Sequence, residues 1–538
     1  MSMLPTADDP ARRDQVTLET GVRLSDSVVW RLQRDSYVRR GLRAWTEDLV
    51  PHFITNNPFF AEIHARIVFA FICDCLESCE KGSDRLAPQK RIRILELGAG
   101  TGKFSFLFLR HLETLLRSRD LPLERVRYCM TDCSEGLIET WRTNPYLAEF
   151  AERNILEFQA FDALQEISPR FLAANAQSRE SLIVIANYFF DSLPQDAFLI
   201  KEGQIFEFLQ TTKKASQDSA DTAPETLQQL QFSYTNAAMF DNRYGDNSWN
   251  AIIDSYRRTL PNATILFPSH ALNTLQAIAK TANGPMLVLA SDKGFVHGAD
   301  LVLAQGPPAF DFHAPNVFSQ MVNFHAIAQH FEDIGGQALL PTKHSLNLNT
   351  CAFLLAPAKH SFPATKAEYE ETQSAFGSDD LFVLLAGLDP HIDKMTVSEI
   401  LALLRLSRWD STTLTRVFPS LARQIPNAPV HRDDLRTAVL LTWANHFPLT
   451  RNDNVLAFYC GALLLELRFF EEAASMFKTS SALFARSAAT SYNLALCSTG
   501  LGRRSEALAL MREASRLDPT FEPAQRSLRK LEDEQPDH

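Results

Sequence analysis

The chain has 538 residues, too many for one compact domain and enough for roughly three or four units of about 150 residues. Hydrophobic residues make up 45% and charged residues 22%, so the chain can bury real cores. The formal net charge of -11 argues against a nucleic-acid binder that depends on a basic surface. The longest apolar runs, such as Ser181–Phe190, are shorter than the roughly 18 residues of a membrane helix. We therefore expect neither nucleic acid nor a membrane as a partner.

The N-terminus and the cysteines predict a cytoplasmic protein. Residues 1–14 are polar and lack the apolar segment of a secretory signal, and eight cysteines in so long a chain do not suggest a disulfide framework. Cys73, Cys75 and Cys79 lie in an apolar helical stretch, where small buried side chains are a better interpretation than a metal cluster. The histidines between residues 296 and 344 contain no H-E-x-x-H motif, and His325 and His330 are five residues apart, so no metal site is expected. A serine hydrolase is also disfavoured, because G-x-S-x-G is absent.

Composition divides the chain into four parts. Residues 1–50 are expected to form an N-terminal arm or a helical cap, since helical spacing begins near Val28. Residues 51–357 form the main domain, with a polar insertion at 211–228, and residues 358–380 are predicted to be a linker to a helical domain at 381–538. Helical stretches alternate in the main domain with short apolar runs, which indicates an α/β sheet covered by helices. The predicted strands are Ile92–Leu97, Val126–Thr131, Leu182–Ala186, Met286–Ala290 and Thr350–Leu355.

The last part of the chain repeats with an offset of 34 residues. Phe458–Gly461 aligns with Tyr492–Ala495, and Glu472-Ala473 aligns with Glu506-Ala507. This pattern resembles the tetratricopeptide repeat, in which each helix pair buries one face on the next pair. A plain helical bundle is the alternative. A repeat array predicts a groove that binds a protein or peptide partner.

A glycine-rich loop follows the first predicted strand. Residues 94–103 read I-L-E-L-G-A-G-T-G-K and lead into a helix near Phe104. Gly98, Gly100 and Gly102 allow a tight turn and close approach of a ligand to the backbone, and the helix start offers free N–H groups to an anion. The pattern E-x-G-x-G-x-G, with Glu96 first, favours an S-adenosylmethionine (SAM) site over a dinucleotide site, and the P-loop motif is absent. A purely structural turn is the alternative.

Two acids follow the next predicted strands. Asp132 can accept hydrogen bonds from ribose hydroxyls, as acids do in related doubly wound folds. Asp162 could meet the adenine amino group, with Phe161 supplying apolar surface. Each acid taken singly could instead be a solvated loop residue.

The segment after the fourth strand carries a family resemblance. Residues 187–194, N-Y-F-F-D-S-L-P, resemble the N-E-F-F-D-A-L-P segment of the MidA-like methyltransferases, the family of the mitochondrial complex I assembly-factor methyltransferase. Other blocks are similar to segments of that family in the same order, so the likeness covers roughly residues 50–357. These blocks are residues 53–59, 95–102, 130–134, 289–294 and 318–324. The resemblance implies a Rossmann-like, SAM-dependent class I methyltransferase whose acceptor is a protein arginine.

Two positions depart from that family. Tyr188 stands where the family has Glu, and Asn323 stands where it has Asp. A guanidinium acceptor needs carboxylates to orient it, so these departures put arginine chemistry in doubt without affecting SAM binding. Asp191 and Asp292 remain as candidate carboxylates, and Asn187 is expected to line the mouth of the acceptor site together with Asp191.

The sequence thus predicts a SAM-dependent methyltransferase domain followed by a helical module that resembles tetratricopeptide repeats. A protein acceptor, recruited by the repeats, is favoured over a small molecule because a repeat groove suits peptides. The first alternative is a catalytically inactive scaffold that keeps the SAM fold while the repeats bind partners. A small-molecule methyltransferase with an attached interaction module is the third hypothesis.

Overall fold

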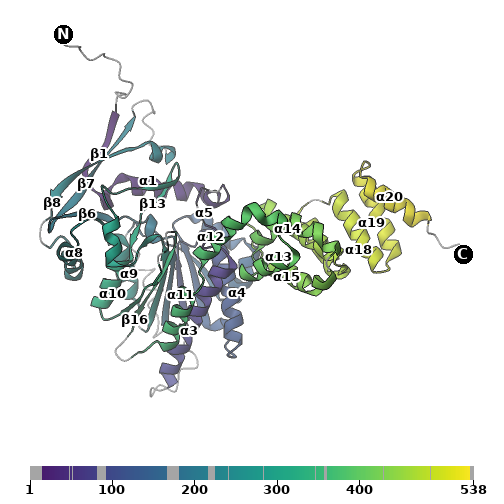
Figure 1. Cartoon of the computed structure of the whole chain (residues 1–538), viewed down its shortest axis with the longest axis horizontal. Coiled ribbons are helices and arrows are strands. Elements are labelled where there is room, and N and C mark those ends of the chain that lie inside the picture. The colour runs from purple at the N-terminus through teal and green to yellow at the C-terminus, as the bar shows by residue number, and fades with distance from the viewer. Residues whose placement is uncertain are drawn as a thin grey trace, which may run out of the picture. The chain divides into compact units, whose positions relative to one another are not determined.

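The computed structural model describes residues 15–47, 49–50, 52–80, 92–165, 181–215, 224–239, 242–282, 284–343, 345, 347–356, 360–427, 429–484 and 486–533. The chain divides into two compact units, residues 1–56 with 61–379 and residues 57–60 with 380–538, and each is described by itself (Figure 1). Among the described residues, no helix has the length and apolar character needed to cross a membrane.

A seven-stranded sheet forms the centre of the first unit, counted over the described residues. The five predicted strands of this region are confirmed, with ends within two residues of those predicted, because their apolar runs are buried on both faces of the sheet. Strands β2, β3, β4, β5 and β10 run parallel, and β16 runs antiparallel to β10 and β15. In spatial order the strands are β15 (Gln337–Leu339), β16 (Asn349–Leu355), β10 (Met286–Asp292), β5 (Ser181–Asn187), β2 (Ile92–Leu97), β3 (Val126–Asp132) and β4 (Leu156–Ala160).

The strand order reverses at β2. The chain first adds β3 and β4 on one side of β2 and then crosses to add β5 and β10 on the other side. In doubly wound sheets, ligands bind at the carboxyl ends of the strands beside such a reversal. Glu96 of β2 pairs with Met130 of β3 and Ile185 of β5, so these three strands end at one edge of the sheet.

Helices cover this sheet and complete its core. Helix α4 begins directly after the glycine loop, and Asn144 caps α6 by accepting a hydrogen bond from the Tyr146 amide. One hydrophobic cluster joins the central sheet to α8, α9 and α10 and includes residues of β6 (Asp196–Lys201) and β9 (Asn262–Phe267). In the described part of the chain, no cluster of three or more His, Cys, Asp or Glu side chains is placed to hold a metal ion. The helices are α3 (Pro58–Glu80), α4 (Lys103–Arg117), α5 (Glu135–Arg142), α6 (Pro145–Glu152), α8 (Asn247–Thr259), α9 (Ser269–Ala279) and α10 (Phe324–Asp333).

The cysteines and two of the histidines considered above as possible metal ligands belong to α3 and α10 where the structure describes them. Cys73 and Cys75 are buried in α3, whereas the side chain of Cys79 and all of His344 lie outside the described residues. His325 and His330 both belong to α10, and each contacts a hydroxyl group: Tyr256 Oη lies 2.9 Å from His325 Nδ1, and Ser248 Oγ lies 3.2 Å from His330 Nδ1.

A second, antiparallel sheet changes two of the predicted boundaries. Residues 15–23, expected in an arm or helical cap, form β1, and residues 211–215 of the expected insertion extend β7, which pairs with β1 on one side and β8 on the other. Both segments look polar because their strands leave many side chains at least partly exposed, so they lack the apolar run of a buried strand. Residues 224–229 form a short 3₁₀ helix. The strands are β1 (Gln15–Arg23), β7 (Gln204–Ala215), β6 (Asp196–Lys201), β9 (Asn262–Phe267) and β8 (Gln231–Ala238).

Two short strand pairs complete the β-structure described for this unit. They are β11 (Gly294–Phe295) with β14 (Val322–Asn323), and β12 (Asp311–Ala314) with β13 (Val317–Ser319).

The segment predicted as a linker, residues 358–380, contains helix α11 (Pro363–Ser374). Asp74 of α3 accepts hydrogen bonds from the amides of Ala364 and Thr365 and from the Thr365 hydroxyl, at 2.7–3.1 Å. Phe362 stacks on Phe71, with ring centroids 5.4 Å apart. The linker prediction is therefore corrected. Only one narrow face of α11 is buried, so its sequence has the polar composition of a linker.

The second unit is helical throughout its described residues from Asp380 onward. Helices α16 and α17 are joined by a short loop, as are α18 and α19, and the second pair follows the first at an offset of 33–34 residues. A Cβ atom on Gly461 would lie 2.9 Å from the Phe477 ring, so α16 and α17 approach each other closely there. The helices are α12 (Ser378–Leu388), α13 (Val397–Leu406), α14 (Ser411–Gln424), α15 (Arg432–Ala444), α16 (Val455–Glu466), α17 (Phe470–Leu483), α18 (Ala488–Gly500), α19 (Arg504–Leu517) and α20 (Glu522–Asp533).

Candidate functional site

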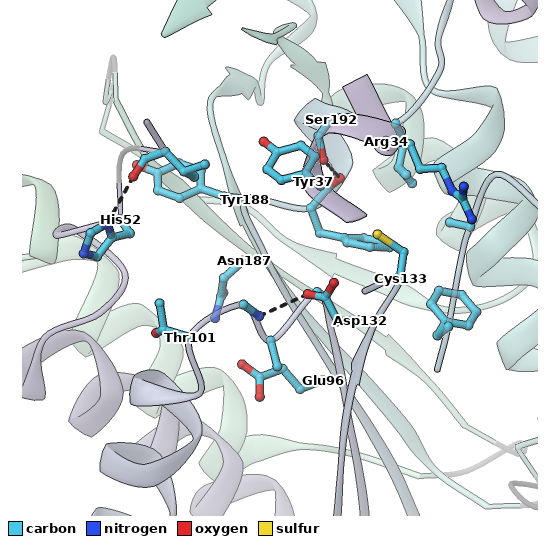
Figure 2. Close-up of a pocket in the computed structure, with 18 of the residues that line it drawn as sticks. Arg34, Tyr37, His52, Glu96, Thr101, Asp132, Cys133, Asn187, Tyr188 and Ser192 are labelled. Carbon is cyan, nitrogen blue, oxygen red and sulfur yellow. Dashed lines mark hydrogen bonds between the residues drawn. The ribbon is translucent and has the colours of Figure 1, made fainter. Parts of the chain in front are cut away.

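A pocket opens at the edge of the central sheet where β2, β3 and β5 end (Figure 2). It lies at the carboxyl ends of parallel strands, where sheets of this kind bind ligands. The glycine loop, the segments after β3, β4 and β5, and part of the N-terminal region all contribute to its walls. Of the site residues predicted from sequence, the pocket brings together Glu96, Gly98, Gly100, Asp132, Phe161, Asp162 and Asn187.

The glycine loop has a backbone that only glycine adopts readily. Gly98, Gly100 and Gly102 have φ angles of 68°, 54° and 79°, in the left-handed region. A Cβ atom on Gly98 would lie 2.9 Å from the Phe189 ring, and one on Gly100 would lie 3.1 Å from the Trp45 indole. Helix α4 begins directly after this loop, and its first amide, that of Lys103, donates a hydrogen bond to the Thr101 hydroxyl at 3.2 Å. Gly102, also predicted to bind the cofactor, is not among the residues that line the pocket, and a Cβ atom on it would lie 3.0 Å from Met130 Cε.

Asp132 ties the end of β3 to this loop. One oxygen of its carboxylate accepts a hydrogen bond from the Gly100 amide at 3.3 Å, and the other accepts one from the Ser134 amide at 3.1 Å. Burial raises the pKa of Asp132 to about 6, since the loss of hydration outweighs these hydrogen bonds. The residue predicted to hold ribose therefore both lines the pocket and shapes the loop beside it.

Glu96 is held at the base of the pocket. Its Oε2 accepts hydrogen bonds from Ser105 Oγ at 2.5 Å and from Tyr128 Oη at 2.9 Å. Burial raises the pKa of this carboxyl to about 7 despite both donors. Glu96 thus connects α4 and β3 to the end of β2, and one of its carboxyl oxygens accepts hydrogen bonds from two protein hydroxyl groups.

Asp162 has a partner that the sequence does not reveal. Its Oδ2 accepts a hydrogen bond from Arg34 Nε at 2.7 Å, and its Oδ1 accepts one from the Leu164 amide at 3.0 Å. Both residues line the pocket, and Phe161 beside them is buried, with its ring 6.4 Å from that of Phe189. The end of β4 therefore presents an apolar ring and an ion pair.

Asn187, the last residue of β5, has unused hydrogen-bonding capacity. Its amide oxygen and nitrogen are both buried, and neither has a hydrogen-bond partner in the part of the chain that the structure describes. Buried polar atoms are nearly always paired, so an unpaired amide that lines a pocket points to a ligand or to bound water. In Figure 2, Asn187 lies between the loop beside Asp132 and the group formed by Tyr37, Tyr188 and Ser192.

The residue after Asn187 has a strained backbone. Tyr188 has a φ angle of 49°, which is rare for an aromatic residue and typical of functional sites. Its amide donates a hydrogen bond to the Ser291 carbonyl at 2.8 Å, and its hydroxyl donates one to the Asn347 carbonyl at 3.4 Å. These contacts hold the turn that carries Phe189 into the pocket.

Asp191 and Asp292, predicted to be catalytic carboxylates, do not line the pocket as described. Asp292 is fully buried, and its Oδ2 accepts a hydrogen bond from the Phe190 amide at 3.2 Å, so it caps the short 3₁₀ turn Phe190–Ser192. Burial raises the pKa of both carboxyls, and repulsion from Asp191 raises that of Asp292 further. The described lining of the pocket therefore contains neither predicted carboxylate: Asp191 is buried in the 3₁₀ turn, and Asp292 is buried at the end of β10.

The N-terminal wall of the pocket, defined here as the described residues of 28–56, corresponds to the helical-cap alternative stated for residues 1–50. The sequence did not identify which residues of the wall line the pocket. The wall comprises α1 (Val28–Arg40), α2 (Arg43–Thr46) and the segment up to Asn56. Helical spacing was its only signal, and spacing does not show which pocket a helix covers. The wall contributes Trp30, Gln33, Arg34, Tyr37, Trp45, Val50, His52, Thr55 and Asn56.

The pocket suits SAM on three structural observations. A Cβ atom at Gly98 would clash with Phe189, one at Gly100 would press against Trp45, and both residues have positive φ angles, so this loop backbone depends on glycine. The unpaired Asn187 amide offers a donor and an acceptor. Phe161 offers an apolar surface of the kind that a purine base requires.

Comparison with known proteins agrees with this chemistry. Residues 77–301 match the model of a family described as "putative S-adenosyl-L-methionine-dependent methyltransferase". No curated protein matches the chain. Among solved structures, an uncharacterized protein of the COG1565 superfamily from Burkholderia thailandensis is similar at 13% identity and a TM-score of 0.40, over 65% of this chain and 90% of that one. A second member from the same organism, bound to S-adenosyl-homocysteine, is similar at 14% identity and a TM-score of 0.36, over 56% and 77%. The CurJ carbon methyltransferase is 13% identical over 55% of each chain, with a TM-score of 0.24.

The family match supports S-adenosyl-L-methionine as the cofactor of this protein and relates it to SAM-dependent methyltransferases. The matched region contains the glycine loop, Asp132, Asp162 and Asn187. It excludes the N-terminal wall and the helical unit.

Proposed function

We propose that this protein is a methyltransferase with a Rossmann-like class I domain, and that it transfers a methyl group from SAM to a protein acceptor. The observation that carries the proposal is the pairing of a glycine cradle at Gly98 and Gly100 with the unpaired amide of Asn187, at the strand ends where such sheets bind ligands. The match of residues 77–301 to a methyltransferase family supports it.

Different residues of the pocket would bind different parts of the cofactor. The glycine loop and the start of α4 would bind its amino-acid end, Asp132 the ribose hydroxyls, and Phe161 one face of the adenine. Asp162 would face the adenine edge. When bound, SAM supplies a methyl group on a sulfonium centre, which is already a good leaving group. These residues therefore need to orient the reactants and exclude water more than to move protons.

Asn187 is the residue best placed to orient the acceptor. Its amide oxygen can accept a hydrogen bond from an incoming N–H or O–H group, and its nitrogen can donate one. The neutral side chains of Tyr37, Tyr188 and Ser192 line the same pocket.

An arginine acceptor has less support. A guanidinium is bound best by carboxylates that can reach it, whereas Asp191 and Asp292 are buried outside the pocket lining, and burial raises the pKa of both carboxyls. Asn323, which replaces an acid of the MidA-like pattern, caps α10 by accepting a hydrogen bond from the Ala326 amide at 2.9 Å. Tyr188 and Asn323 therefore have structural contacts that an arginine site would not need.

The helical unit is proposed to be tetratricopeptide-like and to recruit the protein acceptor. The 33–34-residue offset between the two helix pairs and the close packing at Gly461 and Gly500 support the repeat interpretation. A stacked repeat array presents an extended groove that suits a peptide segment.

A catalytically inactive scaffold is the second candidate. It is favoured by one observation: the carboxylates that line the pocket are all engaged by protein donors, Glu96 by Ser105 and Tyr128, Asp132 by Gly100 and Ser134, and Asp162 by Arg34. Such a protein would bind SAM or its product but transfer no methyl group.

Calorimetric titration of the purified chain with SAM and S-adenosylhomocysteine tests the donor site, with Gly98→Arg as the control variant. Saturable micromolar binding of either ligand that the variant loses would support the proposal. If the folded wild-type chain bound neither ligand, the proposal would be rejected. Incubation with methyl-labelled SAM and a cell extract then separates the two candidates. A methyltransferase labels a discrete protein band, whereas a scaffold labels nothing.

A further inference from the structure

The N-terminal wall, residues 28–56, lies outside the region that matches the methyltransferase family, yet it forms one side of the pocket. Its helix α1 presents four lining residues at the spacing of one helical face: Trp30, Gln33, Arg34 and Tyr37. Such a segment either shields the pocket from solvent or also takes part in binding the ligand. The contacts of Arg34 and Trp45 distinguish these two roles.

The wall is firmly anchored at its beginning. Ser27 caps α1, and Glu19 accepts a hydrogen bond from the Val28 amide at 2.8 Å. Trp30 Nε1 donates to the Leu24 carbonyl at 2.8 Å, and the Phe318 amide donates to Gln33 Oε1 at 2.8 Å. Trp30 also packs on Phe318, with ring centroids 5.1 Å apart. The first half of α1 is thus held at a fixed place beside the pocket.

Arg34 joins the wall to the end of β4. Its Nε donates to Asp162 Oδ2 at 2.7 Å, and its Nη1 donates to Asp35 at 3.0 Å. The Asp162 side chain is 15% exposed and that of Arg34 is 28% exposed, so the pair is shielded from solvent on most sides. An ion pair of this kind fixes the direction of the carboxylate. Arg34 therefore determines how Asp162 faces the pocket.

Trp45 closes the wall over the glycine loop. Its indole atoms Cζ2 and Cε2 lie 3.1 and 3.2 Å from the position that a Cβ atom on Gly100 would occupy. Tyr37 supports the indole, with ring centroids 6.1 Å apart. Because Gly100 lacks a side chain, the indole and the loop backbone meet directly at the pocket.

We infer that the N-terminal wall is part of the cofactor site, with Trp45 as a binding residue at the glycine loop and Arg34 as the positioning residue for Asp162. The inference rests on the proposed function, since it takes SAM and its product S-adenosylhomocysteine as the ligands of this pocket. The family-matched region alone would then be an incomplete site.

Calorimetry of the full chain with S-adenosylhomocysteine tests this inference, because it needs no methyl acceptor. Trp45→Ala should weaken binding about tenfold, the loss expected when an aromatic contact is removed. Arg34→Gln should weaken it about threefold to fivefold, less than the loss of a contact because Asp162 keeps its hydrogen bond from the Leu164 amide. Arg31→Gln is the matched control, since Arg31 is exposed on the same helix and does not line the pocket.

Tryptophan fluorescence provides a second readout. S-adenosylhomocysteine should change the emission of the wild-type chain, and Trp45→Phe should remove most of that change while keeping an aromatic ring and the fold. Trp443→Phe, in helix α15 of the other unit, should leave the change intact. A variant counts only if its circular dichroism and thermal unfolding match the wild type, and Trp45→Phe serves if Trp45→Ala unfolds.

The outcomes separate the two proposals. The inference would be overturned if both Trp45 variants and Arg34→Gln bound S-adenosylhomocysteine with wild-type affinity and Trp45→Phe kept the ligand-induced emission change. The proposed function would still stand. Absence of binding to the wild-type chain would instead reject the proposed function, and the inference with it.

Discussion

Gly98 and Phe189 meet at the base of the pocket, where a Cβ atom on the glycine would lie 2.9 Å from the phenyl ring. The two residues are 91 positions apart (189 minus 98) and come from the ends of neighbouring strands, β2 and β5. The shape of the glycine loop therefore depends on the turn after β5, and a substitution in either segment should shift the backbone of the other.

Gly98→Ala should abolish or weaken S-adenosylhomocysteine binding by at least about tenfold, because the new methyl group forces either the loop or Phe189 to move. Calorimetry measures this loss. Gly203→Ala is the matched control: its φ angle of 72° carries the same backbone strain, but no atom lies within 4 Å of the new methyl group. Equal losses in both variants would show that strain alone, and not the Phe189 contact, matters.

Glu96→Gln should flatten the pH dependence of stability. The folded carboxyl keeps its proton up to about pH 7, whereas the unfolded one loses it near pH 4.5. The folded state binds more protons in this window, so the stabilising contribution of Glu96 is complete below about pH 4.5 and is lost as the pH rises through about 7. In the wild type, the unfolding free energy should therefore fall by an amount on the order of 2–3 kcal/mol across this pH window. The Glu96→Gln variant should not show that decrease.

Urea unfolding at several pH values measures that difference, with Glu152→Gln as the control because Glu152 is exposed. If the Glu96→Gln chain and the wild type lose stability in parallel between about pH 4.5 and pH 7, the buried proton is not on Glu96.

Asn187→Ala should leave the free protein as stable as the wild type or stabilise it by about 1 kcal/mol, since it removes two buried, unpaired amide atoms. Methyl transfer should be lost in the same variant. Thermal unfolding and an extract-labelling assay measure the two effects. Asn144→Ala is the contrast, because Asn144 caps α6 and its loss should cost about 1 kcal/mol. A large destabilisation by Asn187→Ala would indicate a structural role instead.

Asp74→Ala should destabilise the first unit on the order of 2–4 kcal/mol, because it leaves the start of α11 without its buried acceptor. Denaturant unfolding measures this loss. Glu371→Ala, which removes an exposed ion pair of α11 with Arg66, should change stability by less than about 0.5 kcal/mol. A near-neutral Asp74→Ala would restore the view of residues 358–380 as a loose linker.

Gly500→Ala should destabilise the helical unit by about 1–3 kcal/mol, because the new methyl group would lie 2.5 Å from the Phe470 ring of α17. Gly387→Ala, inside α12 with no atom within 4 Å of the new methyl group, should be neutral or stabilising by up to about 1 kcal/mol. Circular dichroism during urea unfolding compares them. Equal effects would argue against close packing of the helix pairs.

Local patterns were enough to predict the donor side of the site. A buried strand, a glycine loop and a helix follow one another within residues 92–117, and each depends mainly on its own neighbours in sequence. The same holds for Asp132 and Asn187, which end their strands. The 34-residue repeat is likewise a local regularity, so the two helix pairs at its end could be located.

Other features depended on partners far away in the chain. Arg34 meets Asp162 across 128 positions, and Asp74 caps a helix about 290 positions later, so neither pair leaves a pattern in sequence. Strand β1 and the second half of β7 are polar because their strands are partly exposed, and they were taken for an arm and an insertion.

The sequence by itself determined where the central strands lie along the chain, where the glycine loop is, and which cofactor it suits. Apolar runs mark buried strands, and closely spaced glycines mark a backbone that other residues rarely adopt. Only the tertiary structure decided that α1 and Trp45 line the pocket and that the buried Asp191 and Asp292 are not among its lining residues. Which side chains share a cavity depends on how distant segments pack, and burial also sets the protonation of the carboxyls that meet there.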